Sequence, residues 1–163
     1  MEFTDIAMEL SREAWQASFN HPFVLQLQEG TLEPSIFRYY LIQDAYYLKS
    51  FSEAYHLLAD KTSNEEMKRL LKQNAQSLVE GELFIRQQFF KELGISDQEM
   101  EQHPIAPTCY HYISHIYRQF AEPNLGIAFA SLLPCPWLYH DLGKALNRKP
   151  SPNPLYQQWI ETY

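Results

Sequence analysis

The sequence contains few of the residues that flexible or disulfide-stabilised proteins need. It has 5 glycines and 2 cysteines in 163 residues. So little glycine argues against a flexible, low-complexity chain, and two cysteines are too few for a disulfide framework. We therefore expect Cys109 and Cys135 to be free thiols, as in a reducing cytosol, and one of them could act as a nucleophile.

Positive charge and long apolar runs are also scarce. The formal net charge is -7 and the 13 lysines and arginines do not cluster, which disfavours a nucleic acid or an anionic membrane as partner. The N-terminal stretch MEFTDIAMELSREAW has acidic residues within its apolar spacing, unlike a signal peptide or a membrane span. The sequence therefore predicts a cytoplasmic protein that binds a small molecule.

Aromatic residues are abundant instead, and they recur with the period of a helix. The chain has 11 tyrosines, 10 phenylalanines and 3 tryptophans, with 45% hydrophobic residues. This predicts one domain over residues 1–163 that buries roughly 70% of its unfolded surface. No alternation of apolar and polar residues is long enough for a strand. We expect an all-α bundle with short connections.

Start and stop signals divide this bundle into helices. The first long helix begins at Pro34, which suits a first helical position, and its core-facing stripe consists of Phe37, Tyr40, Leu41, Leu48, Phe51 and Tyr55. Ser63 and Glu66 form a capping box for a helix that runs to about Leu93 and stops at Gly94. Further helices are expected over residues 4–19, 108–120 and 124–146, from Ser96, and from about Leu155.

A carboxylate interrupts the apolar stripe at Asp44, where it needs a hydrogen-bond donor inside the bundle. Tyr47 follows three residues later on the same face. Two interpretations stay open. Asp44 is a buried side chain satisfied by a tyrosine hydroxyl, as buried polar groups usually are, or it is an acceptor that orients an amine-bearing ligand.

The stretch LLPCPWLYHDLG, residues 132–143, contains Pro134 and Pro136 on either side of Cys135. In a helix interior each proline would remove a backbone hydrogen bond and bend the helix, at about 3 kcal/mol. Tyr139 lies one turn after Cys135, so both side chains can project into one interior space. Cys135 is then either a small hydrophobic core residue or a nucleophile whose thiolate the tyrosine hydroxyl favours.

Two pairs of residues have spacings that metal sites use: Glu53 with His56, and His111 with His115. A di-iron bundle needs a second Glu-x-x-His on a partner helix, and the sequence has none, although Glu80 and Glu82 supply carboxylates. We therefore expect no metal centre. A glycine-rich phosphate loop, a nucleophile elbow and a dinucleotide fingerprint are missing too, which disfavours nucleotide chemistry.

Four segments together resemble the TenA-type thiaminase II family, the aminopyrimidine aminohydrolases of thiamine salvage: YYLIQDAYYLKSF, PTCYHYISHIYRQF, SLLPCPWLYHDLG and NPLYQQWIETY. The combination of Asp-x-x-Tyr with a Pro-Cys stretch that ends in Tyr is more specific than either motif. The resemblance implies a heme-oxygenase-like helical bundle and a homotetramer. It also implies hydrolysis of an aminomethylpyrimidine, or of thiamine, without metal or cofactor.

The resemblance further implies a role for each residue that matches the family's motifs. Cys135 is the catalytic nucleophile, Tyr47 tunes it, and Asp44 holds the amino group of the ring. The slot for the ring is lined by Tyr112, Tyr139 and Tyr163. Aromatic walls suit a flat heteroaromatic substrate because stacking supplies affinity while polar groups set the orientation.

The sequence departs from the family at its end, because it lacks the family's last two helices and the glutamate there that protonates the ring. Loss of a general acid costs about 10²- to 10⁴-fold in rate, unless Glu82 or another carboxylate replaces it. We expect residues 1–163 to be part of a longer chain. In the other interpretation the protein is a non-catalytic pyrimidine-binding regulator, and a metal-dependent oxygenase on a similar bundle is a weaker third possibility.

Overall fold

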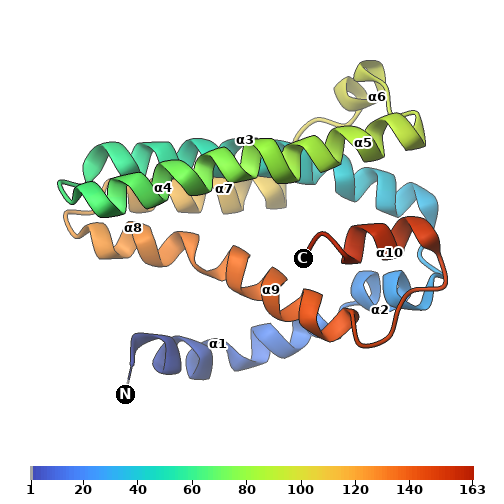
Figure 1. Ribbon diagram of the computed structural model, residues 1–163, viewed down its shortest axis with the longest axis horizontal. Helices are drawn as coiled ribbons and strands as arrows, with labels where there is room; N and C mark the ends of the chain where they lie inside the picture. The colour runs from blue at the N-terminus through green and yellow to red at the C-terminus, as the bar shows by residue number, and fades with distance from the viewer. Residues whose placement is uncertain (1) are drawn as a thin grey trace. The chain divides into compact units, whose positions relative to one another are not determined.

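The computed structural model describes residues 2–163, and every regular element in that range is a helix (Figure 1). In chain order the elements are α1 (Phe3–Phe19), α2 (Pro22–Glu29), α3 (Pro34–Lys61), α4 (Glu65–Ser77), the π-helix η1 (Leu78–Leu83), α5 (Phe84–Leu93), α6 (Asp97–Gln102), α7 (Pro107–Gln119), α8 (Leu125–Leu132), α9 (Pro134–Leu146) and α10 (Pro154–Ile160). The all-α prediction is confirmed. None of these helices combines the length and apolar character that crossing a membrane requires.

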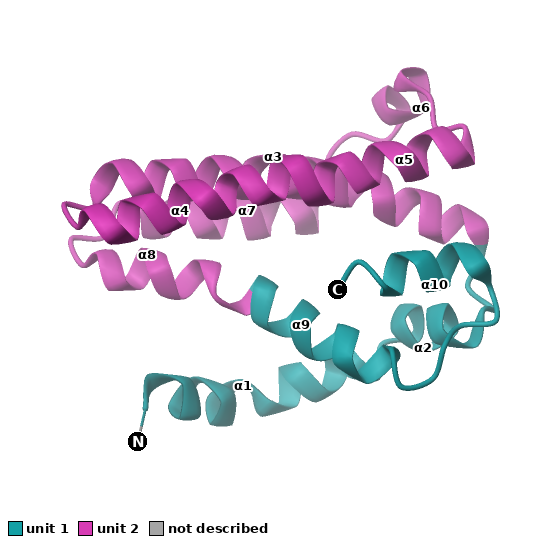
Figure 2. Cartoon of the chain, in the orientation of Figure 1, with its two compact units in different colours: residues 1–33, 135–163 teal, residues 34–134 magenta. Residues whose placement is uncertain are grey.

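The helices form two compact units, shown in different colours in Figure 2. Unit 1 consists of residues 1–33 and 135–163, and unit 2 consists of residues 34–134. The chain therefore starts in unit 1, builds unit 2 and returns to complete unit 1. A single domain over residues 1–163 stays a prediction.

The core of unit 2 is built around α3. This helix is 28 residues long and begins at Pro34, as predicted. Every residue of the predicted stripe is buried except Tyr40, which is half-buried. The helices α4, η1, α5, α7 and α8 all pack against α3. Phe37 meets Phe89 of α5 edge to face, with ring centroids 6.0 Å apart, so α5 is anchored near the start of α3.

The segment predicted as one helix after Ser63 is three elements in the structure: α4, η1 and α5. The capping prediction was wrong by one residue, because the side chain of Asn64, not of Ser63, accepts the N–H of Met67 at 2.9 Å. Asparagine caps a helix as well as serine does, so the sequence offered two equivalent caps. The predicted stop is confirmed, since Gly94 ends α5 in the left-handed conformation with φ 65°.

The segment predicted as one helix over residues 124–146 is two helices, α8 and α9, with Leu133 between them. Pro134 is the first residue of α9 and Pro136 lies in its first turn. The N–H groups of a first turn have no partner within the helix, so proline is tolerated there. The expectation that both prolines lie in a helix interior was therefore wrong, because they begin a helix.

Unit 1 joins residues that are far apart in the sequence. The hydroxyl of Ser151 donates to the carbonyl of Leu27 at 2.8 Å, and the hydroxyl of Tyr156 donates to the carbonyl of Leu32 at 2.7 Å. All four residues are buried. These bonds fix the segment before α10 and α10 itself to the end of α2.

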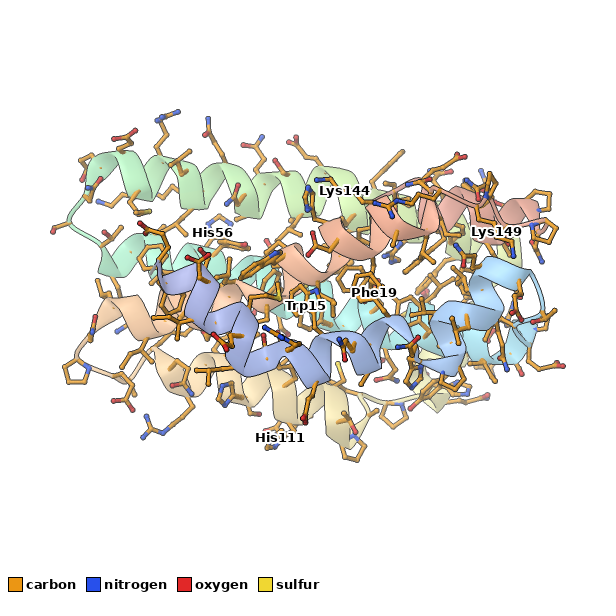
Figure 3. The ribbon with its side chains drawn as sticks, turned by 90° about the horizontal axis from the view of Figure 1, so that it is seen from below. Trp15, Phe19, His56, His111, Lys144 and Lys149 are labelled. Atoms are coloured by element: carbon orange, nitrogen blue, oxygen red, sulfur yellow. The ribbon has the colours of Figure 1, made fainter. Side chains whose placement is uncertain are left out.

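Helix α1 has no buried residue, and it contacts α9 through an aromatic pair. The rings of Trp15 and Trp137 meet edge to face with centroids 5.4 Å apart. Figure 3 labels Trp15 on this helix, with Phe19 one turn later. Such a pair contributes about 0.5–1.5 kcal/mol beyond the apolar area it buries.

Candidate active site

Asp44 lies in the middle of α3 with 7% of its surface exposed. Its carboxylate accepts a hydrogen bond from Nε of Arg86, which belongs to α5 and is 2% exposed. The hydroxyl of Tyr40, one turn earlier on α3, also forms a hydrogen bond to Asp44. A tyrosine partner agrees with one of the two sequence interpretations, whereas the arginine was not predicted.

A signal for Arg86 was present in the sequence. The residue stands three positions before Phe89, and both are the buried residues of α5. The helical period puts them on one face, where an apolar side chain is the rule. A lone arginine on such a face indicates a buried carboxylate partner, because an unpaired charge there is costly.

Burial and charge act on the Asp44 carboxyl in opposite directions. Burial, the larger effect, raises its pKa, while the guanidinium of Arg86 and the hydroxyl of Tyr40 lower the pKa. Arginine stays protonated in proteins, so a neutral Asp44 would leave a buried cation without its counter-charge. The pair is therefore ionised in the folded protein at neutral pH.

Glu82 lies beside this pair, on the π-helix η1 and half-buried. Burial and the charge of Asp44 raise the pKa of Glu82, and the charge of Arg86 lowers it. Single π-helical turns within α-helices are frequent at functional sites. A raised pKa brings a carboxyl group closer to the working pH, as general-acid catalysis requires.

Tyr47 and Tyr112 form an aromatic stack in unit 2. Their ring centroids are 5.6 Å apart with an interplanar angle of 10°. The ring of Tyr47 also stacks with that of Phe51, at 5.1 Å and 22°. Tyr112 is half-buried on α7 and also lines a hollow of about 270 Å³ between α7 and α8, together with His115 and Ser131.

Cys135, Tyr139 and Tyr163 belong to unit 1. Cys135 is half-buried in the first turn of α9, an end of a helix that favours negative charge. The rings of Tyr139 and Tyr163 lie 4.6 Å apart, and Trp159 of α10 contacts both. Gly143 on α9 allows this approach, since a Cβ there would lie 2.6 Å from the backbone of Tyr163.

The second free thiol, Cys109, is half-buried on α7. Its Sγ donates to the carbonyl of Gln43 at 3.7 Å. Burial and the charge of Asp44 both raise the pKa of this thiol, so it is held in the neutral form, which is a poor nucleophile. Of the two free cysteines, Cys135 is therefore the better candidate.

The residues of the predicted metal spacings lie on the surface or bind protein groups. His56 on α3 and His111 on α7, both labelled in Figure 3, are exposed. The carboxylate of Glu53 accepts a hydrogen bond from the hydroxyl of Tyr117 at 3.3 Å. Within residues 2–163, no three histidine, cysteine, aspartate or glutamate side chains gather in a way that could hold a metal ion.

The predicted site residues thus form two groups, one in each unit. Unit 2 contains Asp44, Tyr47, Glu82 and Tyr112, and unit 1 contains Cys135, Tyr139 and Tyr163. Within its own unit each group is held by aromatic contacts or by the buried ion pair.

Comparison with known proteins assigns the family. The model of the TENA/THI-4/PQQC family matches residues 10–163. The chain belongs to this family. A relative of this TENA/THI-4/PQQC protein in Bacillus subtilis (strain 168), named aminopyrimidine aminohydrolase, is 36% identical over 163 residues, which are 100% of this chain and 69% of the relative. A protein of the same name in Halalkalibacterium halodurans is 30% identical, with 100% of this chain and 74% of the relative covered.

Solved structures share the fold. A TenA homologue from P. horikoshii OT3 superimposes with a TM-score of 0.91 at 26% identity, covering 100% of this chain and 77% of the homologue. A protein described as a TenA family transcription regulator, from Silicibacter sp. TM1040, superimposes with a TM-score of 0.90 at 26% identity, with coverages of 99% and 72%. The heme-oxygenase-like bundle implied by the sequence resemblance is confirmed.

Proposed function

We propose that this TENA/THI-4/PQQC protein is an aminopyrimidine aminohydrolase of the thiaminase II type, a hydrolase that acts on carbon–nitrogen bonds. The observation that carries the proposal is the match of the whole chain, at 36% identity, to the Bacillus subtilis protein of that name. The substrate is an aminomethylpyrimidine or thiamine, and the product that retains the ring is hydroxymethylpyrimidine.

Two features of unit 2 support a flat, amino-substituted ring as the ligand. Asp44 is a buried anion, and a carboxylate has about four lone-pair sites, so it can accept from the ring's amino group besides its protein donors. Tyr112, whose ring stacks on that of Tyr47, is an aromatic surface on which a flat heteroaromatic ring can stack. In the proposed site Tyr112, Tyr139 and Tyr163 line the ring.

In the proposed reaction the thiolate of Cys135 attacks the ring carbon next to the ring nitrogen, which takes up a proton. The amino group on the adjacent methylene, protonated as an ammonium, leaves as ammonia with its bonding electrons, and a ring electron pair forms the double bond to the methylene. Water adds to the methylene and loses a proton. The ring nitrogen then gives up its proton, the carbon–sulfur bond breaks, and the aromatic ring and the thiolate are restored. This is covalent catalysis in two easier steps, with Tyr47 tuning the nucleophile and no cofactor consumed.

The proton for the ring nitrogen needs a donor of suitable pKa. Glu82 is the described carboxyl that fits, because burial and Asp44 raise its pKa. We propose Glu82 as an accessory acid. The family's own glutamate, which the resemblance implies beyond the position of Tyr163, is the alternative donor.

The test is ammonia release from 4-amino-5-aminomethyl-2-methylpyrimidine, measured with the wild-type protein and with Cys135→Ser. We expect release by the wild type and none by the variant, with binding of the hydroxymethyl product nearly unchanged, since serine keeps the shape but is a far weaker nucleophile. Cys109→Ser is the matched control and should keep most of the activity. Turnover that survives in Cys135→Ser would overturn the covalent mechanism.

A second candidate function is a non-catalytic regulator that senses the same pyrimidine. The description of the Silicibacter relative as a transcription regulator favours it, although five relatives named as aminohydrolases match the whole chain. Tight binding of the pyrimidine by the wild type, with no ammonia formed on long incubation, would support the regulator and contradict the hydrolase.

The resemblance also leads us to propose a role in thiamine salvage, a cytoplasmic location and a homotetramer. Light scattering on the purified protein tests the assembly, because a tetramer has a mass about four times the 19.3 kDa of the chain. Comparing kcat/KM for thiamine with that for the aminomethylpyrimidine tests the salvage role. A higher kcat/KM for the aminomethylpyrimidine would support the salvage role, and a higher value for thiamine would contradict it.

A further inference from the structure

The ion pair of Asp44 with Arg86 contains the carboxylate that we propose binds the amino group of the substrate. Both side chains are almost completely removed from water, at 6% and 2% exposure. A buried ion pair is weak evidence for a stabilising role, because removing two charges from water costs about as much as their attraction returns. A functional role for the charged carboxylate explains such a buried pair better than a contribution to stability does.

The ion pair also constrains the orientation of the Asp44 carboxylate. The guanidinium is a rigid planar group, and here its Nε donates to Oδ2 of Asp44 across the contact between α5 and α3. A planar donor limits the orientations that the carboxylate can adopt, which lysine, a flexible point charge, does not do. Arg86 therefore determines both the charge of Asp44 and the direction in which its oxygens point.

We infer that Arg86 is a positioning residue for substrate binding, which keeps Asp44 anionic and oriented to accept the amino group of the pyrimidine. This inference rests on the proposed function. Arg86 itself touches Asp44 and not the reacting atoms. Its effect on the reaction passes through that one carboxylate.

The charged and titratable groups around Asp44 support this assignment. They are Tyr40 on the same helix, Glu82 on η1, Arg86 on α5 and Cys109 on α7. Arg86 is the cation of this set, while Glu82 and Cys109 would add negative charge if they ionised. Without Arg86, burial would be opposed by one hydroxyl alone, so the pKa of Asp44 would rise further and its protonated form would be favoured.

The experiment compares wild type with Arg86→Met and Arg86→Lys. The readouts are kcat and KM for the aminomethylpyrimidine and the Kd of the hydroxymethyl product, whose side chain has no titrating amine. In Arg86→Met we expect Kd and KM to rise about 10- to 100-fold at neutral pH, the loss expected for a hydrogen bond to a charged group. We expect kcat to change much less.

The pH dependence separates positioning from a purely structural role. In Arg86→Met, binding should recover as the pH is raised, because the carboxylate is regained. The ratio of the variant's Kd to the wild-type Kd cancels titration of the ligand itself. Arg86→Lys keeps a positive charge, so it should restore the wild-type pH profile with a Kd between the other two.

A double-mutant cycle tests whether Arg86 acts through Asp44. Asp44→Asn should weaken binding, and adding Arg86→Met to it should weaken binding little further. Arg38→Met is the matched control, since Arg38 pairs with Glu99 in the same unit at about one-quarter exposure and has no part in the site. Thermal melts of every variant identify loss of folding, in which case Arg86→Lys carries the test.

The outcomes are distinct. A wild-type protein that neither binds nor hydrolyses the pyrimidine contradicts the proposed function and this inference with it. A wild-type protein that hydrolyses the substrate, with folded Arg86 variants that keep the wild-type Kd and pH profile, overturns this inference alone.

Discussion

Ion pairs in this chain differ mainly in how much water reaches them. The side chains of Lys68 and Glu65, which pair on α4, are 30% and 81% exposed, whereas those of Asp44 and Arg86 are almost completely buried. Exposed pairs contribute about 0.2–1 kcal/mol and are screened by salt. The buried pair is insulated from salt, so ionic strength should affect substrate binding through Asp44 very little.

Glu82→Gln tests the accessory acid. Glutamine keeps the size and hydrogen bonding of the protonated side chain but cannot donate a proton to the ring, so we expect kcat to fall about 10²- to 10⁴-fold. The measurement is kcat against pH, with Glu80→Gln as control because Glu80 is exposed in the same π-helix and accepts from Gln76. A wild-type kcat in Glu82→Gln would assign the proton to another group.

The same variant has an effect on stability whose sign follows from the pKa. The pKa of Glu82 is raised in the folded protein, so folding favours its protonated form, and this contribution is lost as the pH rises through the folded value. Glu82→Gln carries no such charge. We expect it to melt at a higher temperature than wild type on the alkaline side of that pKa, and a lower melting temperature there would contradict the assigned shift.

At the scale of elements, the short-range signals determined where helices begin and end. Asn64 caps α4 by accepting the N–H of Met67, and Gly94 ends α5 in a conformation that glycine adopts without strain. Proline begins α2, α3, α7, α9 and α10. Each of these residues acts on backbone groups within a few positions.

Asn64→Ala should destabilise the protein by about 1 kcal/mol, because the amide of Met67 loses its acceptor. Ser63→Ala, the neighbouring control, should have a much smaller effect. Urea denaturation measures both free energies of unfolding. Equal losses in the two variants would contradict the assignment of Asn64 as the cap.

Gly143→Ala tests the contact between α9 and Tyr163. The added Cβ would lie 2.6 Å from a backbone carbon of Tyr163, so that residue must move, and with it the ring that contacts Tyr139. We expect a lower melting temperature and weaker binding of the hydroxymethyl product. Gly81→Ala is the control, since a Cβ there would meet nothing within 4 Å beyond its chain neighbours and the backbone of its own helix, and it should be neutral or stabilising.

The sequence predicts local features of the fold better than its long-range pairings. The start of α3 at Pro34 and the end of α5 at Gly94 follow from short motifs and are confirmed. The partnership of Asp44 with Arg86 spans 42 positions and depends on how α3 and α5 pack, which no local pattern encodes. The roles of Cys135 and Tyr47 come from family resemblance and stay predictions.

At the scale of the whole molecule, Tyr117 should contribute to the loss of stability at alkaline pH. The hydroxyl of Tyr117 donates to the carbonyl of Ser50 and the carboxylate of Glu53. Burial and the charge of Glu53 raise the pKa of Tyr117 from 10.0 to about 12. Above pH 10 the Tyr117 hydroxyl is deprotonated in the unfolded chain but still protonated in the folded protein. The free energy of unfolding therefore falls as the pH rises toward about 12.

Tyr117→Phe should reduce this alkaline loss. We expect the free energy of unfolding of the wild type to decline more steeply than that of the variant between about pH 10 and about pH 12. The control is Tyr110→Phe, because Tyr110 on the same helix is 62% exposed. Parallel slopes for wild type and Tyr117→Phe would contradict the shift.

The return of the chain to unit 1 sets an order of events on the ribosome. The carbonyls of Leu27 and Leu32 are each made 124 residues before the hydroxyl that binds them. At about 5–20 residues per second, this interval is about 6–25 s. Residues 34–134, which make up all of unit 2, are synthesised during this interval. Unit 2 can therefore fold before the hydrogen bonds from Ser151 and Tyr156 to the end of α2 are able to form.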